Sequence, residues 1–329
     1  MKPLRVVVIS DSFATLPEAV ALLKDSGLEV TYVPALKPWF DLDAEERAAL
    51  QEAQAVITGR GPNVDSAQLA LAPHLRVIAL HTSGSDNIDL PEATRRGIVV
   101  TNVKGVNAEQ CAEFAMGLML SVVRQIRTGD RALRAGMWAE QTQSSMDVYG
   151  ATVGVIGFGG IAKAFLRRAR AFGMKMLVHT RTPRLEQAEE LGVRFVSLDE
   201  LLEQADVVSL FASLGKDSYH MIGARELARM KRSAYLINIA RGELIEQAAL
   251  IDVLRNHRIA GAGLDVFENE PVFSSPLFDL DNVVLTPHQA GLTVGGKTGA
   301  AVRAARNALT ALEGTIPPDT INPDAWTKK

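Results

Sequence analysis

A glycine-rich segment, TVGVIGFGGIAKAF at residues 152–165, has the spacing of a phosphate-binding turn. It follows a strand pattern and opens a helical one, with glycine, glycine and alanine in GxGxxA order. The first glycine permits a tight turn, the second lets the backbone approach a pyrophosphate, and Ala162 allows close helix-to-strand packing. The helix N-terminus then offers N–H groups to phosphates. A purely structural turn would share the spacing, but this context favours a dinucleotide site formed by Gly157, Phe158, Gly159, Gly160 and Ile161.

The residues after the next strand, KMLVH, bear on which nicotinamide cofactor such a site would take. A site for NAD usually has a carboxylate here that accepts hydrogen bonds from the ribose hydroxyls. Thr180 stands at that position, Arg181 follows it, and Arg184 lies close behind. A neutral residue beside a guanidinium suits a 2′-phosphate, so the sequence favours NADP(H), with NAD(H) as the alternative. On the competing interpretation, Arg181 is only a solvated loop charge.

His288 follows the strand pattern VVLT and is therefore expected at the carboxyl edge of a parallel sheet, where ligands of α/β proteins bind. Reduction of a ketone by hydride requires a proton for the developing alkoxide, and an imidazolium can deliver it near neutral pH. A lone histidine is more often structural, so this role for His288 depends on the groups around it.

Seven segments, taken in order, resemble the D-isomer-specific 2-hydroxyacid dehydrogenase family over nearly the full chain. They are SGSDNIDL, GVNAEQCAEFA, ALRAGMW, the glycine motif, MKRSAYLINIARGELI, GLDVFENEP and TPHQAG. Several separated motifs in the family's order are much harder to obtain by chance than any one of them. The resemblance implies hydride transfer between a nicotinamide cofactor and a small 2-keto or D-2-hydroxy acid.

The same resemblance implies a catalytic trio. Arg241, after INIA, would bind the substrate carboxylate and keto oxygen, work that suits a planar and permanently charged guanidinium. His288 would protonate the oxygen. Glu270, in ENEP, would hydrogen-bond His288 and stabilise the protonated imidazole. Glu268 is the local competitor for that position.

Further site residues are also implied by the resemblance. Asp265, at the end of GAGLD, would lie beside the nicotinamide, and Ala240 would belong to the cofactor site. In the first part of the chain, the backbone N–H groups of Ser83 and Gly84 would meet the substrate carboxylate. Arg60, in TGRG, would face the same cleft or else be only a surface charge.

Three positions depart from the family's pattern, and none touches the trio. Gly160 stands where the family often has arginine, which removes one phosphate contact. Ser213, in FASLGKDS, replaces a common proline in the loop expected beneath the cofactor. Thr180 replaces the usual acidic residue.

The elements that must position these residues are visible as apolar runs of four to six residues, alternating with helical patterns. Runs without strict polar alternation suit strands covered on both faces, and the intervening helices imply parallel order. The first series contains RVVVIS, VTYV, AVIT, RVIAL and GIVVTN. The second contains six strand patterns between Thr152 and Leu285, as a complete dinucleotide-binding sheet requires.

Two helical segments connect these series. A long helix over residues 107–133 is expected to link two domains and present one face to each. An alanine-rich helix from Thr293 to about Gly314 is expected to pack back on the first domain. The sequence thus predicts an α/β protein with two doubly wound parallel-sheet domains. These are a flavodoxin-like substrate domain, residues 1–104 plus 293–329, and an inserted Rossmann cofactor domain, residues 105–292.

Composition narrows the function classes. The 35 Lys and Arg nearly balance the 38 Asp and Glu, so no strong field points to nucleic acid or an anionic membrane. No apolar run approaches the roughly 20 residues of a membrane span. Cys111, the sole cysteine, lies in an apolar stretch, which indicates a core residue and a reducing cytoplasm. We expect a cytoplasmic homodimer without a metal site, by family resemblance and base rates.

The predicted function is reduction of a small 2-keto acid to its D-2-hydroxy acid, with NADPH favoured. Two alternatives remain open at this stage. One is an NAD-dependent 2-hydroxyacid or 3-phosphoglycerate dehydrogenase. The other is a nicotinamide-sensing scaffold without turnover, because such scaffolds can keep the trio.

Overall fold

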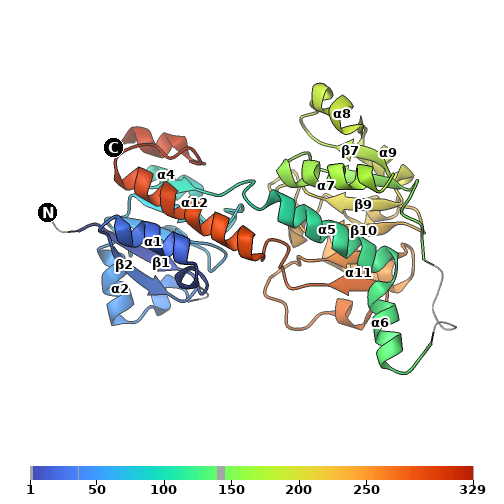
Figure 1. Ribbon diagram of the computed structural model, residues 1–329, viewed down its shortest axis with the longest axis horizontal. Coiled ribbons are helices and arrows are strands. Elements are labelled where there is room, and N and C mark those ends of the chain that lie inside the picture. The colour runs from blue at the N-terminus through green and yellow to red at the C-terminus, as the bar shows by residue number, and fades with distance from the viewer. Residues whose placement is uncertain (1–2, 36, 139–144, 329) are drawn as a thin grey trace. The chain divides into compact units, whose positions relative to one another are not determined.

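The computed structural model describes residues 3–35, 37–138 and 145–328. The chain forms two compact units, one of Met1–Asn107 with Leu292–Lys329 and one of Ala108–Gly291 (Figure 1). Each unit contains a parallel sheet with helices on both faces. In the first unit, alternate residues of one strand lie in two different hydrophobic clusters, since Val6 and Val8 belong to one and Val7 and Ile9 to the other. This double burial explains the uninterrupted apolar strand patterns.

The first unit has five parallel strands in the order β2-β1-β3-β4-β5. They are β1 Arg5–Ile9, β2 Glu29–Val33, β3 Ala55–Thr58, β4 Val77–Leu80 and β5 Val99–Thr101. The helices are α1 Pro17–Asp25, α2 Ala44–Gln51, α3 Ser66–Leu69, α4 Leu90–Arg95 and α12 Val294–Leu312. The alanine-rich α12 contacts α1, β3 and β4, as expected for a C-terminal helix that returns to this sheet. Figure 1 shows α12 beside α1.

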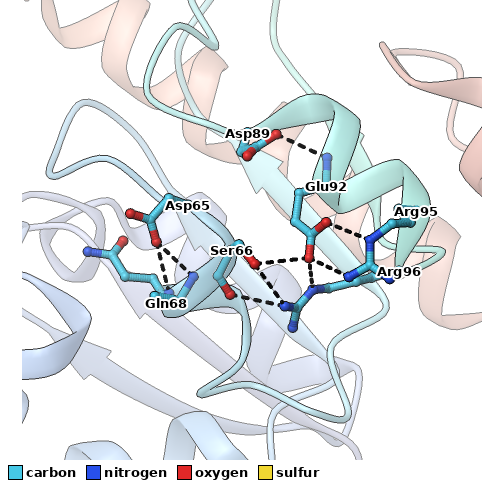
Figure 2. A network of polar contacts seen from close by, with 8 residues as sticks. Asp65, Ser66, Gln68, Asp89, Glu92, Arg95 and Arg96 are labelled. Atoms are coloured by element: carbon cyan, nitrogen blue, oxygen red, sulfur yellow. Dashed lines mark hydrogen bonds and ion pairs between the residues drawn. The ribbon is translucent and has the colours of Figure 1, made fainter.

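A polar network joins the short helices α3 and α4 in this unit (Figure 2). Glu92 accepts hydrogen bonds from Arg95 and Arg96, each at 2.7 Å, and from the Ser66 hydroxyl at 3.2 Å. These contacts, with those from Arg95 and Arg96 the strongest, lower the pKa of Glu92 to about 2. Because folding lowers the pKa of Glu92, the network stabilises the folded unit at pH values above the usual pKa of a glutamate. This contribution is lost as the pH falls toward 2 and the carboxylate becomes protonated.

The second unit has seven parallel strands in the order β12-β11-β10-β9-β6-β7-β8. They are β6 Thr152–Ile156, β7 Lys175–His179, β8 Arg194–Phe195, β9 Val207–Leu210, β10 Tyr235–Asn238, β11 Gly261–Leu264 and β12 Val283–Leu285. The helices are α5 Ala108–Val123, α6 Ile126–Arg134, α7 Gly160–Ala171, α8 Leu185–Leu191, α9 Leu198–Gln204, α10 Ala224–Leu227 and α11 Gln247–Arg255. From β6 the chain adds β7 and β8 on one side of the sheet and then returns to add β9 to β12 on the other side. The topological switch point therefore lies between β6 and β9.

The predicted fold class is confirmed: both units are doubly wound α/β domains, and their strand orders are those of flavodoxin-like and Rossmann sheets. Six of the seven strands in the second unit match the sequence patterns. The seventh, β8, has only two residues and is too short to leave a periodic signal.

The expected single helix over residues 107–133 is wrong. The chain leaves the α conformation at Gln125, whose φ is 52°, and α5 and α6 are separate helices. The buried face of α5 packs on α7, β10 and β11, all in the second unit. The prediction failed because apolar residues recur at helical spacing on both sides of Gln125, and one residue in the left-handed conformation does not interrupt that sequence pattern. No helix within the described residues combines the length and apolar character that a membrane span needs.

Candidate active site at the strand ends

Three neighbouring strands of the second unit end in register. Asn238 of β10 pairs with Leu264 of β11, and Leu264 pairs with Leu285 of β12. Arg241, Glu270 and His288 lie in the loops that follow these strands. Because adjacent strands are about 4.8 Å apart, the three loops start within about 10 Å of one another. The fold therefore brings the predicted trio to one edge of one sheet.

The side chains of His288 and Glu270 form a direct hydrogen bond. The imidazole Nδ1 lies 2.7 Å from Glu270 Oε2, and the two side chains are 22% and 25% exposed. The other oxygen, Glu270 Oε1, accepts a hydrogen bond from the Phe267 N–H at 3.0 Å. Nδ1 donates to the carboxylate, so Nε2 is the ring nitrogen that can exchange a proton with a substrate. Glu268, the competing carboxylate, instead bonds His220.

The turn that carries His288 is held by Asp265. This carboxylate is fully buried, and it accepts hydrogen bonds from Thr286 Oγ1, Gln289 N and Ala290 N at 2.7 to 2.9 Å. His288 has a φ of 48°, a left-handed conformation that costs a residue with a Cβ about 1 to 3 kcal/mol. Charge-assisted hydrogen bonds to the buried carboxylate offset that cost. Asp265 therefore positions His288, while its predicted contact with the nicotinamide stays a prediction.

Arg241 is positioned by a buried amide that the sequence analysis missed. Asn238 is fully buried; its Nδ2 donates to the Arg241 carbonyl at 2.8 Å, and its Oδ1 accepts from Ala240 N at 3.0 Å. The Arg241 guanidinium also donates to the Ala240 carbonyl. A polar residue that ends the otherwise apolar strand YLIN was the available signal, because a buried amide there must find backbone partners.

The glycine-rich loop lies between β6 and α7. Gly157 has a φ of 99°, and a Cβ at this position would lie 2.8 Å from the backbone nitrogen of Ala212. Gly159 is the N-cap residue of α7, and a Cβ there would meet no protein atom within 4 Å. Open space at the N-terminus of a twelve-residue helix, next to the switch point, is what a pyrophosphate requires. The residues present fit a dinucleotide.

The side chains of this loop pack inward. The rings of Phe158 and Phe195 pack edge to face with their centres 5.1 Å apart. Lys163 Nζ lies 5.2 Å from the centre of the Phe158 ring. Ile161 packs against a hydrophobic cluster of the unit. At these positions and at Gly160, the first residue of α7, the backbone is thus the group available to a phosphate.

Thr180 and Arg181 follow β7, the neighbour of β6. Arg181 lies 3.4 Å from Asp217, and both side chains are about four-fifths exposed, at 83% and 78%. Such an exposed pair contributes about 0 to 1 kcal/mol, so the guanidinium can exchange this partner for a phosphate. Arg184, at the N-terminus of α8, is also exposed. Ser213, which stands where the family commonly has proline, lies in a loop held by a hydrogen bond from the Ser218 hydroxyl to the Ser213 carbonyl.

In the first unit, Arg60 and the Ser83–Gly84 turn follow the adjacent strands β3 and β4, whose last residues, Thr58 and Leu80, are paired. The carbonyl of Ser83 accepts from Asn102 at 2.9 Å, and that of Gly84 accepts from Thr82 at 3.0 Å. Both contacts engage carbonyls, so they fix the turn without using its N–H groups. Arg60 is exposed and has its own contacts.

Cys111 lies on the buried face of α5. Burial, with a smaller effect from the Asp265 charge, raises the pKa of its thiol to about 11. The thiol is therefore protonated at neutral pH and serves as a core side chain.

Comparison with known proteins identifies the family. Residues 116–290 match the model of the D-isomer specific 2-hydroxyacid dehydrogenase, NAD binding domain. A glyoxylate reductase of Thermococcus gammatolerans is 43% identical over 83% of this chain and 84% of its own. Among solved structures, a glyoxylate reductase from Paecilomyes thermophila has a TM-score of 0.87 at 31% identity and covers 98% of this chain and 99% of its own.

A second solved relative contains ligands. It is an NADPH-dependent glyoxylate/hydroxypyruvate reductase from Sinorhizobium meliloti in complex with NADP and malonate, with a TM-score of 0.85 at 29% identity over 99% of this chain and 98% of its own. With the family model matched across the β6 to β12 sheet and a close relative aligned over most of the chain, this protein belongs to the D-isomer specific 2-hydroxyacid dehydrogenase family and is an oxidoreductase with a domain for a nicotinamide cofactor.

Proposed function

We propose that this protein reduces a small 2-keto acid, of the size of glyoxylate or hydroxypyruvate, to the D-2-hydroxy acid with NADPH. The observation that carries the proposal is the His288–Glu270 hydrogen bond of 2.7 Å at the strand ends that also carry Arg241. It is a proton donor held by a carboxylate, on the same sheet edge as a guanidinium. The named relatives, which are glyoxylate reductases, support the substrate class.

Each member of the trio has a distinct task in this proposal. The nicotinamide, when bound, supplies hydride to C2 of the keto acid. Arg241 donates hydrogen bonds to the substrate carboxylate and to the keto oxygen, each contributing about 1.5 to 3 kcal/mol. His288 delivers its Nε2 proton to that oxygen while Nδ1 stays bonded to Glu270. Glu270 fixes one imidazole orientation and stabilises the imidazolium. In the reverse direction, His288 is the base.

The unit formed by residues 1–107 and 292–329 is proposed as the substrate domain, into which the cofactor domain of residues 108–291 is inserted. Its Ser83–Gly84 turn would donate backbone N–H groups to the substrate carboxylate, with Arg60 as a further cation. The carbonyl contacts from Asn102 and Thr82 support this role, because they fix the turn and engage only its acceptors.

The preference for NADPH rests on Thr180 and Arg181. Thr180, the first residue after β7, carries no charge to repel a 2′-phosphate, and the exposed, weakly paired guanidinium of Arg181 can bind one in place of Asp217. The relative solved in complex with NADP supports the same choice.

A homodimer is part of the proposal. Helix α6 has no buried residue, and its Ile126 and Leu133 are 57% and 59% exposed. Apolar side chains exposed in this way favour a protein partner, and a second copy is the commonest one. Light scattering should give about twice the mass of one chain, and a monomer would contradict this.

A substrate panel with both cofactors tests the function. We expect glyoxylate and hydroxypyruvate to oxidise NADPH, with kcat/KM at least about tenfold higher than with NADH, the effect of one charge-assisted contact to the 2′-phosphate. Equal values with both cofactors would remove the NADPH preference. Activity confined to phosphohydroxypyruvate would indicate a phosphoglycerate dehydrogenase, and no turnover with any keto acid would contradict the proposal.

A further inference from the structure

A second histidine–carboxylate pair lies beside the first. His220 Nε2 is 2.5 Å from Glu268 Oε1, and the side chains are 33% and 22% exposed. His220 belongs to the connection after β9 and Glu268 to the loop after β11, while β10 lies between these two strands. The pair thus links the loops on either side of the strand that leads into Arg241. Neither residue has a task in the proposed chemistry.

Backbone contacts bind the segment after Arg241 to the His220 side. The His220 N–H donates to the Glu243 carbonyl at 2.8 Å, and the Ile222 N–H donates to the Leu244 carbonyl at 3.0 Å. The residue pair Ile222 and Ile245 forms an isolated parallel bridge. Displacement of the His220 connection would therefore also displace the backbone that continues from Arg241.

The other side of the same segment packs against the loop of Glu268. A Cβ at Gly242 would lie 1.9 Å from the carbonyl carbon of Phe267, so the two backbones are in direct contact. The Glu268 N–H donates to Gln247 Oε1 at 3.3 Å. The neighbouring Phe267 N–H donates to Glu270, the partner of His288. The loop that carries Glu268 therefore packs on Gly242, the residue after Arg241, and also contains Glu270.

We propose that the His220–Glu268 pair positions the active site, by fixing the loop after β11 against the segment after Arg241. It acts through Arg241 and Glu270. The inference rests on the proposed function, because its consequence is the alignment of the substrate-binding guanidinium. If the His220–Glu268 pair only stabilised the fold, its loss would lower stability without weakening substrate binding more than cofactor binding.

The test compares His220→Asn with His257→Asn. Both histidines have left-handed backbones, with φ of 50° and 49°, and asparagine tolerates that conformation. His257 lies between α11 and β11, at the amino end of the strand, and is the matched control. We expect His220→Asn to raise the KM for hydroxypyruvate about tenfold, the loss of part of one charge-assisted contact, with a smaller change in kcat. The KM for NADPH and the melting temperature should match those of His257→Asn.

Glu268 gives an independent arm. Glu268→Gln keeps an acceptor for His220 and should keep the hydroxypyruvate KM near the wild-type value, whereas Glu268→Ala should reproduce the rise seen with His220→Asn. The inference alone is overturned if His220→Asn behaves as His257→Asn in an active enzyme, or if its KM rises equally for NADPH. Absence of turnover in the wild type would instead overturn the proposed function, and this inference with it.

Discussion

His288→Asn is expected to lower kcat for keto-acid reduction about 10²- to 10⁴-fold, the range for loss of a general acid. Asparagine is the informative replacement because His288 has a φ of 48°, which asparagine tolerates, so the turn held by Asp265 should persist. Asparagine cannot deliver a proton at neutral pH. The steady-state rate with hydroxypyruvate and saturating NADPH measures the effect.

Two controls separate proton transfer from damage to the fold. Binding of NADPH, followed by fluorescence, should stay within about threefold of wild type, because the glycine-rich loop lies at β6 rather than at the β12 end of the sheet. Glu270→Gln should give a smaller loss than His288→Asn, since it keeps an acceptor for Nδ1 at the 2.7 Å contact but removes the charge. A kcat for His288→Asn within tenfold of wild type would show that another group supplies the proton.

Arg241→Gln is expected to lower kcat/KM for hydroxypyruvate by about 10²-fold or more, since it removes two charge-assisted hydrogen bonds of about 1.5 to 3 kcal/mol each. Arg241→Lys should lose less, because it keeps the charge without the planar fork. Most of the loss should appear in KM if the carboxylate contact dominates and in kcat if the keto-oxygen contact does.

Arg225→Gln is the matched control for this measurement. Arg225 is an arginine of the same unit that pairs with Asp199 and Glu226 on the surface. It should change kcat/KM by less than twofold, because its partners Asp199 and Glu226 have no task in the proposed chemistry and its ion pairs bear on stability rather than on substrate binding. If Arg241→Gln changed kcat/KM no more than Arg225→Gln, Arg241 would have no contact with the substrate.

Most of the fold could be predicted because buried parallel strands have a distinctive composition. Runs such as AVIT and VIAL are almost wholly apolar and are buried at every position, since both faces of the sheet are covered, and they coincide with β3 and β4. The break at Gln125 was not predictable in the same way. Helix ends depend on single backbone angles, and the apolar pattern of α5 runs on into α6.

The candidate site was predictable only in part. Resemblance to a family supplied the trio, and register explains why residues so far apart in sequence reach one sheet edge. The supporting contacts were not visible, because they join loops whose paths the sequence does not specify. Asn238, the hydrogen bonds of Asp265 to the His288 turn, and the His220–Glu268 pair all connect residues after different strands or across a turn. Such partners become apparent only once the strand order is known.

The configuration of the product tests the central claim most directly. Hydroxypyruvate should be reduced with NADPH, and the glycerate that forms should be separated on a chiral column. The proposed function predicts D-glycerate, formed at a rate that falls with His288→Asn. Formation of L-glycerate, or of D-glycerate at an unchanged rate in that variant, would contradict it.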